Sequence, residues 1–150
     1  MTNAIDLQLI GNLGGTYLWS IIAISNIAQG SAVLAMIYLN RKDKEEKQVS
    51  IPACISCYLG VTEPAMFGVN LKYGFHFLSA MIGSSIASVV LIVNKFMANS
   101  IGVGGLPGIL SIKPEFMFIF FIAMIIAIVV PFILTIILSK SRNTQFKIFK

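Results

Sequence analysis

The sequence predicts an all-α integral membrane protein with about three full transmembrane helices, a re-entrant broken-helix hairpin around Glu63 and a glycine-rich loop. Composition and charge distribution lead to this fold class. The chain has 150 residues, of which 57% are hydrophobic and 11% charged, and its mean hydropathy is +0.87. A soluble globular domain carries about 25% charged residues. A soluble domain is therefore excluded, and so is a disordered chain, which would be polar.

Three stretches without Asp, Glu, Lys or Arg predict the full spans. They are Tyr17–Leu39, Tyr73–Asn94 and Phe116–Ser139, with 23, 22 and 24 residues. Each exceeds the roughly 20 apolar residues that a spanning helix needs. Between the first two stretches, the hydrophilic residues Asn40 to Gln48 predict a soluble loop.

Two further apolar stretches contain many helix-breaking residues. Residues 49–71 include Pro52, Gly60, Pro64 and Gly68, and residues 96–112 carry the glycine-rich run Gly102 to Gly108. This density of glycine and proline argues against a continuous helix in either stretch.

The basic residues predict how the chain crosses the membrane. One cluster follows the first span and another follows the last: Arg41, Lys42, Lys44, Lys47, and Lys140, Arg142, Lys147, Lys150. Loops rich in Lys and Arg stay in the cytoplasm, so an even number of crossings must separate the clusters. Residues 49–71 are then re-entrant and the C-terminus is cytoplasmic. The alternative, in which residues 49–71 span the membrane and 96–112 form a fourth crossing, also gives an even number.

Glu63 is the main candidate for a binding residue. A carboxylate inside a membrane segment marks a functional cavity, because burying it there costs several kcal/mol unless it is paired or hydrated. Since a residue before proline is disfavoured in a helix, the Glu63-Pro64 step predicts a break between half-helices Pro52–Leu59 and Ala65–Leu71, near the bilayer midplane. Broken helices at that depth line the substrate cavities of transporters. The other interpretation is an interfacial loop with a solvated glutamate.

Other polar residues are interpreted more simply. Asn26, Gln29 and Gly30 share one face of the first span, where an amide can bind a hydroxyl-rich ligand or bond to another helix. Interhelical bonding is favoured for Asn26, and both interpretations stay open for Gln29. Cys54 and Cys57 are interpreted as small buried residues. His76 is the only histidine. No catalytic constellation, metal site or cofactor is predicted, and the net charge of +5 does not indicate nucleic-acid binding, because the basic residues flank the spans.

The run Gly60-Val-Thr-Glu-Pro-Ala-Met-Phe-Gly68 resembles a signature of enzyme IIC of the bacterial phosphotransferase system, in its glucose and sucrose/β-glucoside group. Val69 to Gly74, Gly102 to Gly108 and Asn26 to Ser31 are also similar to this family. Within this family, the residues of these runs are most similar to those of the trehalose-specific members.

The resemblance implies a sugar permease of about ten spans in the bacterial inner membrane. Its motif glutamate, here Glu63, would bind a disaccharide, and trehalose is the expected sugar. We expect Thr62 and Gln29 to assist Glu63. A phosphocysteine on a separate IIB domain would phosphorylate the sugar, a role that neither Cys54 nor Cys57 inherits.

The resemblance also bears on domain organisation. Residues 1–150 match the C-terminal third of a IIC domain, without a IIB or IIA domain. The expected partners are the lipid bilayer, a IIB domain, and either the missing N-terminal spans or a second copy. The family's intramembrane histidine would lie upstream, and His76 does not match it. The alternative function is a non-transporting membrane remnant or an accessory subunit that packs against a complete permease.

Overall fold

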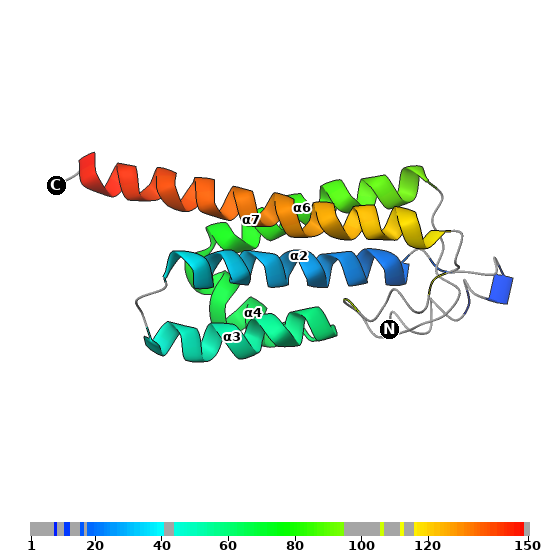
Figure 1. Ribbon diagram of the computed structural model, residues 1–150, viewed down its shortest axis with the longest axis horizontal. Helices are drawn as coiled ribbons and strands as arrows, with labels where there is room; N and C mark the ends of the chain where they lie inside the picture. Colours follow the sequence, from blue (N-terminus) through cyan, green and yellow to red (C-terminus); the bar gives the residue numbers. More distant parts are fainter. Residues whose placement is uncertain are drawn as a thin grey trace.

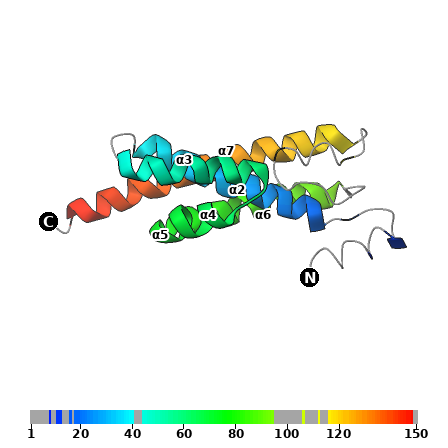
Figure 2. The same cartoon turned by 90° about the horizontal axis from the view of Figure 1, so that it is seen from below.

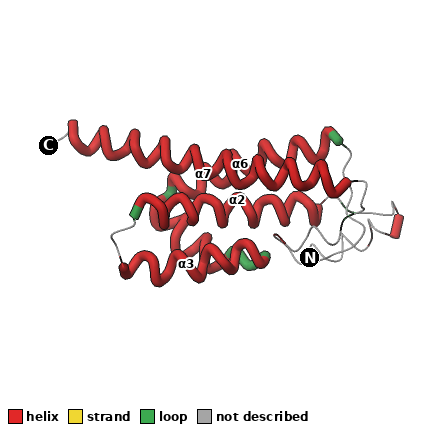
Figure 3. Tube along the Cα trace, in the orientation of Figure 1, coloured by secondary structure: helices red, strands yellow, loops and turns green. Residues whose placement is uncertain are grey.

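The structure is a computed structural model. It describes residues 8, 11–12, 16, 18–40, 44–94, 106, 112 and 116–148, with the backbone alone for residue 73 and residues 141–148. The predicted glycine-rich loop and the stretch 96–112 lie almost wholly outside these residues. Within them the chain is helical nearly throughout, as the tube in Figure 3 shows.

Three long helices form the body of the molecule. They are α2 (Leu18–Leu39), α6 (Phe75–Val93) and α7 (Met117–Ile148). Helix α6 runs antiparallel to α2 and α7, and all three pack on one another (Figure 1). Each is long and apolar enough to cross a membrane, over Leu18–Leu39, Phe75–Val93 and Met117–Lys140. The three predicted spans and the all-α fold class are confirmed.

The core of this bundle combines large aliphatic side chains with alanines. Ile24 and Ile27 of α2 pack against Leu91 of α6 and Phe120 of α7, all at most 2% exposed. Ala23, Ala28, Ala87, Ala123 and Ala127 lie among them, at most 1% exposed. Small residues at helix interfaces let backbones approach closely, which matters in a bilayer because hydrophobic burial does not drive helix association there.

Helices α6 and α7 are in closest contact where Gly83 meets Pro131. Helix α7 continues through this proline. A Cβ atom added at Gly83 would lie 2.2 Å from Cγ and 2.6 Å from Cδ of the proline ring. Only glycine therefore fits at position 83 with the helices in this arrangement.

A helical hairpin packs along α2. Its first arm is α3 (Lys44–Leu59), which runs antiparallel to α2. After a turn at residues 60–62, the second arm continues through α4 (Glu63–Ala65), the π-helical η1 (Met66–Asn70) and α5 (Leu71–Tyr73). Gly74, with φ of 67°, joins this arm to α6. Figure 2 shows the second arm returning alongside α3.

The hairpin fits the re-entrant arrangement, because its two ends lie at the same end of the bundle (Figure 1). The alternative in which residues 49–71 cross from one end to the other is wrong for this structure.

The boundaries of the hairpin differ from the sequence prediction in two places. The predicted loop Asn40–Gln48 is shorter, because α3 already begins at Lys44. Lys, Glu and Gln are good helix formers, and Glu45 and Glu46 in the first turn interact favourably with the helix dipole.

The predicted break at Glu63-Pro64 is also displaced. Glu63 is the first residue of the second arm, and the non-helical residues come before it. Pro64 is tolerated there because the amides of the first helical turn have no intrahelical partner to lose.

The contact between Gly83 and Pro131 leads to a stability prediction. Gly83→Ala should lower the free energy of unfolding by about 1–3 kcal/mol, as expected for overpacking. The measurement is reversible unfolding in mixed micelles followed by circular dichroism. Adding Pro131→Ala should recover part of the loss, because the ring atoms Cγ and Cδ are removed.

Gly68→Ala is the matched control, since its new Cβ would meet only Cγ1 of Val49 at the ordinary distance of 3.5 Å. Equal losses for the two alanine variants would contradict the packing argument.

The arrangement of the helices leads to a topology prediction. In a chain with both native cysteines replaced by alanine, single cysteines at Gln48 and Ser139 should react from the cytoplasmic side with a membrane-impermeant maleimide. A cysteine at Asn94, at the opposite end of α6, should react only from the other side. The measurement compares right-side-out with inverted vesicles, and reaction of Gln48→Cys and Ser139→Cys from opposite sides would refute the arrangement.

Candidate functional site

The turn of the hairpin lies against the middle of α2. The side-chain amide of Asn26 donates a hydrogen bond from Nδ2 to the carbonyl oxygen of Gly60, at 3.2 Å. Asn26 is eight residues from the start of α2 and thirteen from its end, or about 12 Å and 20 Å at 1.5 Å per residue. The non-helical backbone thus lies well inside the bundle and not at its end.

The local sequence explains why the chain turns here. Gly60 has φ of 103°, a conformation that favours glycine. Its amide donates to the Cys57 carbonyl at 3.0 Å, and the Val61 amide donates to the Ser56 carbonyl at 2.8 Å. This pair of bonds is the Schellman motif that ends a helix. The second arm then begins with the Met66 amide donating to the Thr62 carbonyl at 2.8 Å.

Close packing fixes the first arm to α2. A Cβ atom at Gly30 would lie only 3.1 Å from Cβ of Cys57, so the two backbones approach closely at this point. The Cys54 thiol lies 3.5 Å from the Gly30 carbonyl oxygen, and the Ser31 and Tyr58 hydroxyl oxygens are 3.2 Å apart.

The two cysteines have the packing role predicted for them. Both are free and buried, with exposed fractions of 5% for Cys54 and 0% for Cys57. The residues that the structure describes include no group of three or more His, Cys, Asp and Glu side chains that could hold a metal ion.

Glu63 and Thr62 lie together directly after the turn. Glu63 is exposed and Thr62 is half-buried. A carboxylate at the first helical position interacts favourably with the positive end of the helix dipole. The arrangement therefore presents an exposed hydrogen-bond acceptor directly after the turn of the hairpin.

By helical spacing Gln29 shares a face of α2 with Asn26 and Gly30, which contact the hairpin. Its Oε1 atom is buried and has no hydrogen-bond partner in the described part of the chain. No hydrogen bond joins Gln29 to Thr62 or Glu63 among the described residues. Asn26, by contrast, bonds within the protein, although its acceptor is the turn residue Gly60 rather than the other helix that the sequence favoured.

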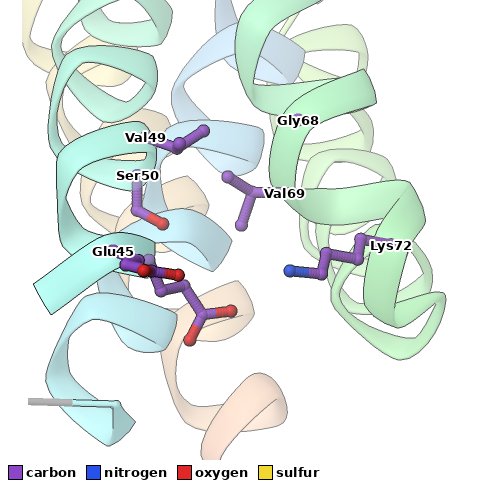
Figure 4. A pocket seen from close by; sticks show the side chains of 7 residues that line it. Glu45, Val49, Ser50, Gly68, Val69 and Lys72 are labelled. Carbon is purple, nitrogen blue, oxygen red and sulfur yellow. The ribbon is translucent and has the colours of Figure 1, made fainter. Parts of the chain in front are cut away.

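A cavity of about 280 Å³ lies at the other end of the hairpin, between the first turns of α3 and the end of the second arm. Figure 4 shows the Lys72 side chain directed across this cavity toward α3. Its lining residues are Glu45, Glu46, Val49, Ser50, Gly68, Val69 and Lys72. The predicted site residues do not line it.

Two polar side chains on the hairpin are buried, and the sequence did not predict this. Ser50 is 1% exposed and Asn70 is fully buried, and the Ser50 hydroxyl and both Asn70 amide atoms lack a hydrogen-bond partner within the described residues. Asn70 could have been found from its place two residues after the Gly60–Gly68 motif. Ser50 gave no signal beyond its position near the start of an apolar stretch.

The bond between Asn26 and Gly60 generates a prediction about hairpin docking. Asn26→Leu should increase the fraction of molecules with the hairpin detached from α2 about threefold, since such bonds contribute about 0.6 kcal/mol on average in membranes. The measurement is the alkylation rate of Cys57 in a Cys54→Ala background, because Cys57 is buried between the hairpin and α2.

Ser85→Ala serves as the control, since the exposed Ser85 hydroxyl donates to the Met81 carbonyl within its own helix α6. An unchanged rate in Asn26→Leu would show that this bond does not hold the hairpin in place.

Comparison with known proteins assigns the chain to a family. Residues 8–84 match the family described as "Phosphotransferase system, EIIC". The trehalose-specific EIIBC component of Escherichia coli strain K12 is 58% identical over 134 residues, covering 89% of this chain and 28% of that protein. The trehalose-specific EIIBC component of Bacillus subtilis strain 168 is 52% identical over 130 residues, covering 86% and 27%.

A sucrose-specific relative is more distant. The sucrose-specific EIIBC component of Pasteurella multocida is 45% identical over 145 residues, covering 95% of this chain and 30% of that protein. The chain thus spans less than a third of the length of these relatives. No solved structure gives a significant match. From the family match and its apolar helices, the chain is an integral membrane protein that belongs to the EIIC family of the phosphotransferase system.

Proposed function

We propose that this chain forms part of a phosphotransferase permease, and that it binds a disaccharide at the hairpin turn during passage across the bacterial inner membrane. Trehalose is the proposed sugar. Membership of the EIIC family supports the transport role, and the names of the two trehalose-specific relatives support the choice of sugar.

The observation that carries the proposal is the position of Glu63. Its carboxylate is exposed next to a turn that contacts α2 about 12 Å from one end of that helix and 20 Å from the other. An intramembrane carboxylate is stable only with a hydrated or polar neighbour. A sugar provides hydroxyl groups, whose hydrogen bonds to a carboxylate are charge-assisted and therefore strong.

Two neighbours can supply further hydrogen bonds. The Thr62 hydroxyl can donate to or accept from a sugar hydroxyl, and it adjoins Glu63 in the chain. The Oε1 atom of Gln29 is an acceptor whose protein partner is lacking within the described residues. An unsatisfied buried acceptor costs about 1–3 kcal/mol, which a sugar hydroxyl donating to it would recover. We assign both residues assisting roles.

Phosphorylation of the sugar is assigned to a IIB domain outside these 150 residues. The relatives bear the name EIIBC, which fits a IIB partner. The two basic clusters of the sequence support a cytoplasmic C-terminus, on the side where a IIB domain would act.

A chimera gives the sharpest test of the site. The aligned 134 residues of the Escherichia coli relative are replaced by those of this chain, and trehalose binding and phosphoenolpyruvate-dependent uptake are measured. Glu63→Gln should weaken binding about ten- to hundredfold, because a charged hydrogen bond contributes about 1.5–3 kcal/mol. The protein should still insert into the membrane.

Glu45→Gln is the matched control, because it removes the same charge at the opposite end of the hairpin and should leave trehalose affinity unchanged. Gln29→Leu should weaken binding while leaving the unfolding free energy nearly unchanged, since no described hydrogen bond to Oε1 is lost. Wild-type affinity in an inserted Glu63→Gln chimera would refute the site. A chimera that inserts but neither binds nor transports would favour the remnant or accessory alternative.

A further inference from the structure

A groove of about 320 Å³ lies apart from the proposed sugar site, where the end of α2, the start of α3 and the middle of α7 meet. Its lining residues are Leu34, Ile37, Tyr38, Lys47 and Phe132. None of them has a role in the proposed function. The groove shares no lining residue with the cavity shown in Figure 4.

The lining separates into an apolar part and a polar end. Leu34, Ile37 and Phe132 offer only hydrocarbon, whereas Lys47 contributes an ammonium group and Tyr38 a hydroxyl. The rings of Tyr38 and Phe132 pack with centroids 6.1 Å apart and planes tilted by 59°, which holds α7 against the end of α2. Tyr38 is nevertheless 51% exposed and Leu34 40% exposed, so the groove opens outward.

The groove lies at the level where a spanning helix leaves the hydrocarbon. Tyr38 is the residue before the end of α2, and Lys47 is in the first turn of α3. Tyrosine is enriched at the boundary between hydrocarbon and water, and long lysine side chains reach toward it. An occupant of the groove would therefore have its polar part at the lipid headgroups and its apolar part beside the acyl chains.

Charges at the start of α3 are divided between the groove and the cavity. Lys44 and Lys47 are three residues apart and so share one face, and Lys47 lines the groove. Glu45 and Glu46 line the cavity of Figure 4, and Glu46 also accepts a hydrogen bond from the Asn40 amide. The groove thus presents a cation to its occupant, while the neighbouring carboxylates are directed to a different cavity.

We propose that this groove binds an anionic phospholipid, with its phosphate on Lys47 and Tyr38 and an acyl chain along Leu34, Ile37 and Phe132. The charge selects an anion, and basic pockets between helices at the cytoplasmic surface bind such headgroups. The apolar part of the groove favours a ligand that carries a hydrocarbon chain. A phospholipid has such a chain and a soluble phosphate does not.

The experiment is native mass spectrometry of the 150-residue chain released from a zwitterionic detergent. The probes are palmitoyl-oleoyl phosphatidylglycerol and the phosphatidylcholine with the same chains. We expect one phosphatidylglycerol to bind at least tenfold more tightly than phosphatidylcholine. Lys47→Gln should abolish most of this preference, weakening phosphatidylglycerol binding about tenfold, the effect of losing one charged hydrogen bond. Lys47→Arg should retain it.

Lys72→Gln is the matched control, because it removes the same charge from the cavity of Figure 4 and should leave the preference intact. Glycerol 1-phosphate, which carries the headgroup charge without chains, should not displace the lipid. Equal binding of the two lipids, an unchanged preference in Lys47→Gln, an equal loss in Lys72→Gln, or displacement by glycerol 1-phosphate would each overturn the proposal.

Discussion

Non-helical backbone inside a membrane bundle needs a partner for every polar group that the helix no longer satisfies. In this chain the need arises at residues 60–62, where the hairpin turns. The amides of Gly60 and Val61 bond back into α3, and the Gly60 carbonyl accepts from Asn26 of α2. The polar side chain that α2 supplies opposite the turn therefore helps the turn to lie deep in the bundle. This constraint shapes the rest of the fold.

One consequence is that different residues of α2 face the hairpin and the core of the bundle. The face toward the hairpin combines apolar Val33 and Met36, which pack with the hairpin side chains, with small or polar residues. Gly30 allows the close approach of Cys57, and the Ser31 hydroxyl meets that of Tyr58. Other residues of α2, such as Ile24 and Ile27, pack into the core with α6 and α7. The helix is thus buried between the bundle and the hairpin, and it connects the two.

A second consequence concerns where unsatisfied polar groups lie. Within the bundle, the buried Ser79 and Thr135 hydroxyls satisfy each other at 2.9 Å. Around the hairpin, Gln29, Ser50 and Asn70 each have a buried polar atom without a hydrogen-bond partner in the described residues. Buried groups of this kind are uncommon in folded proteins. Trp19 and Ser20, near the start of α2, also carry such atoms, so these groups are not confined to the hairpin. The π-helical turn η1 is a further feature of the hairpin that occurs often at functional sites.

The sequence by itself determined the helical membrane class, the three spans and the family, and it left two arrangements open for residues 49–71. These features depend on local properties: runs of apolar residues, glycine and proline at helix ends, and the motif from Gly60 to Gly68. The tertiary structure decided which polar groups meet. The ring of Pro131, 48 residues away, leaves no room for a Cβ atom at position 83. Asn26 donates its hydrogen bond to a carbonyl 34 residues along the chain. Such pairings follow from helix packing, which hydrophobic patterns do not encode. The start of α3 and the burial of Ser50 and Asn70 likewise depend on how the two arms pack, so they became visible only in the folded chain.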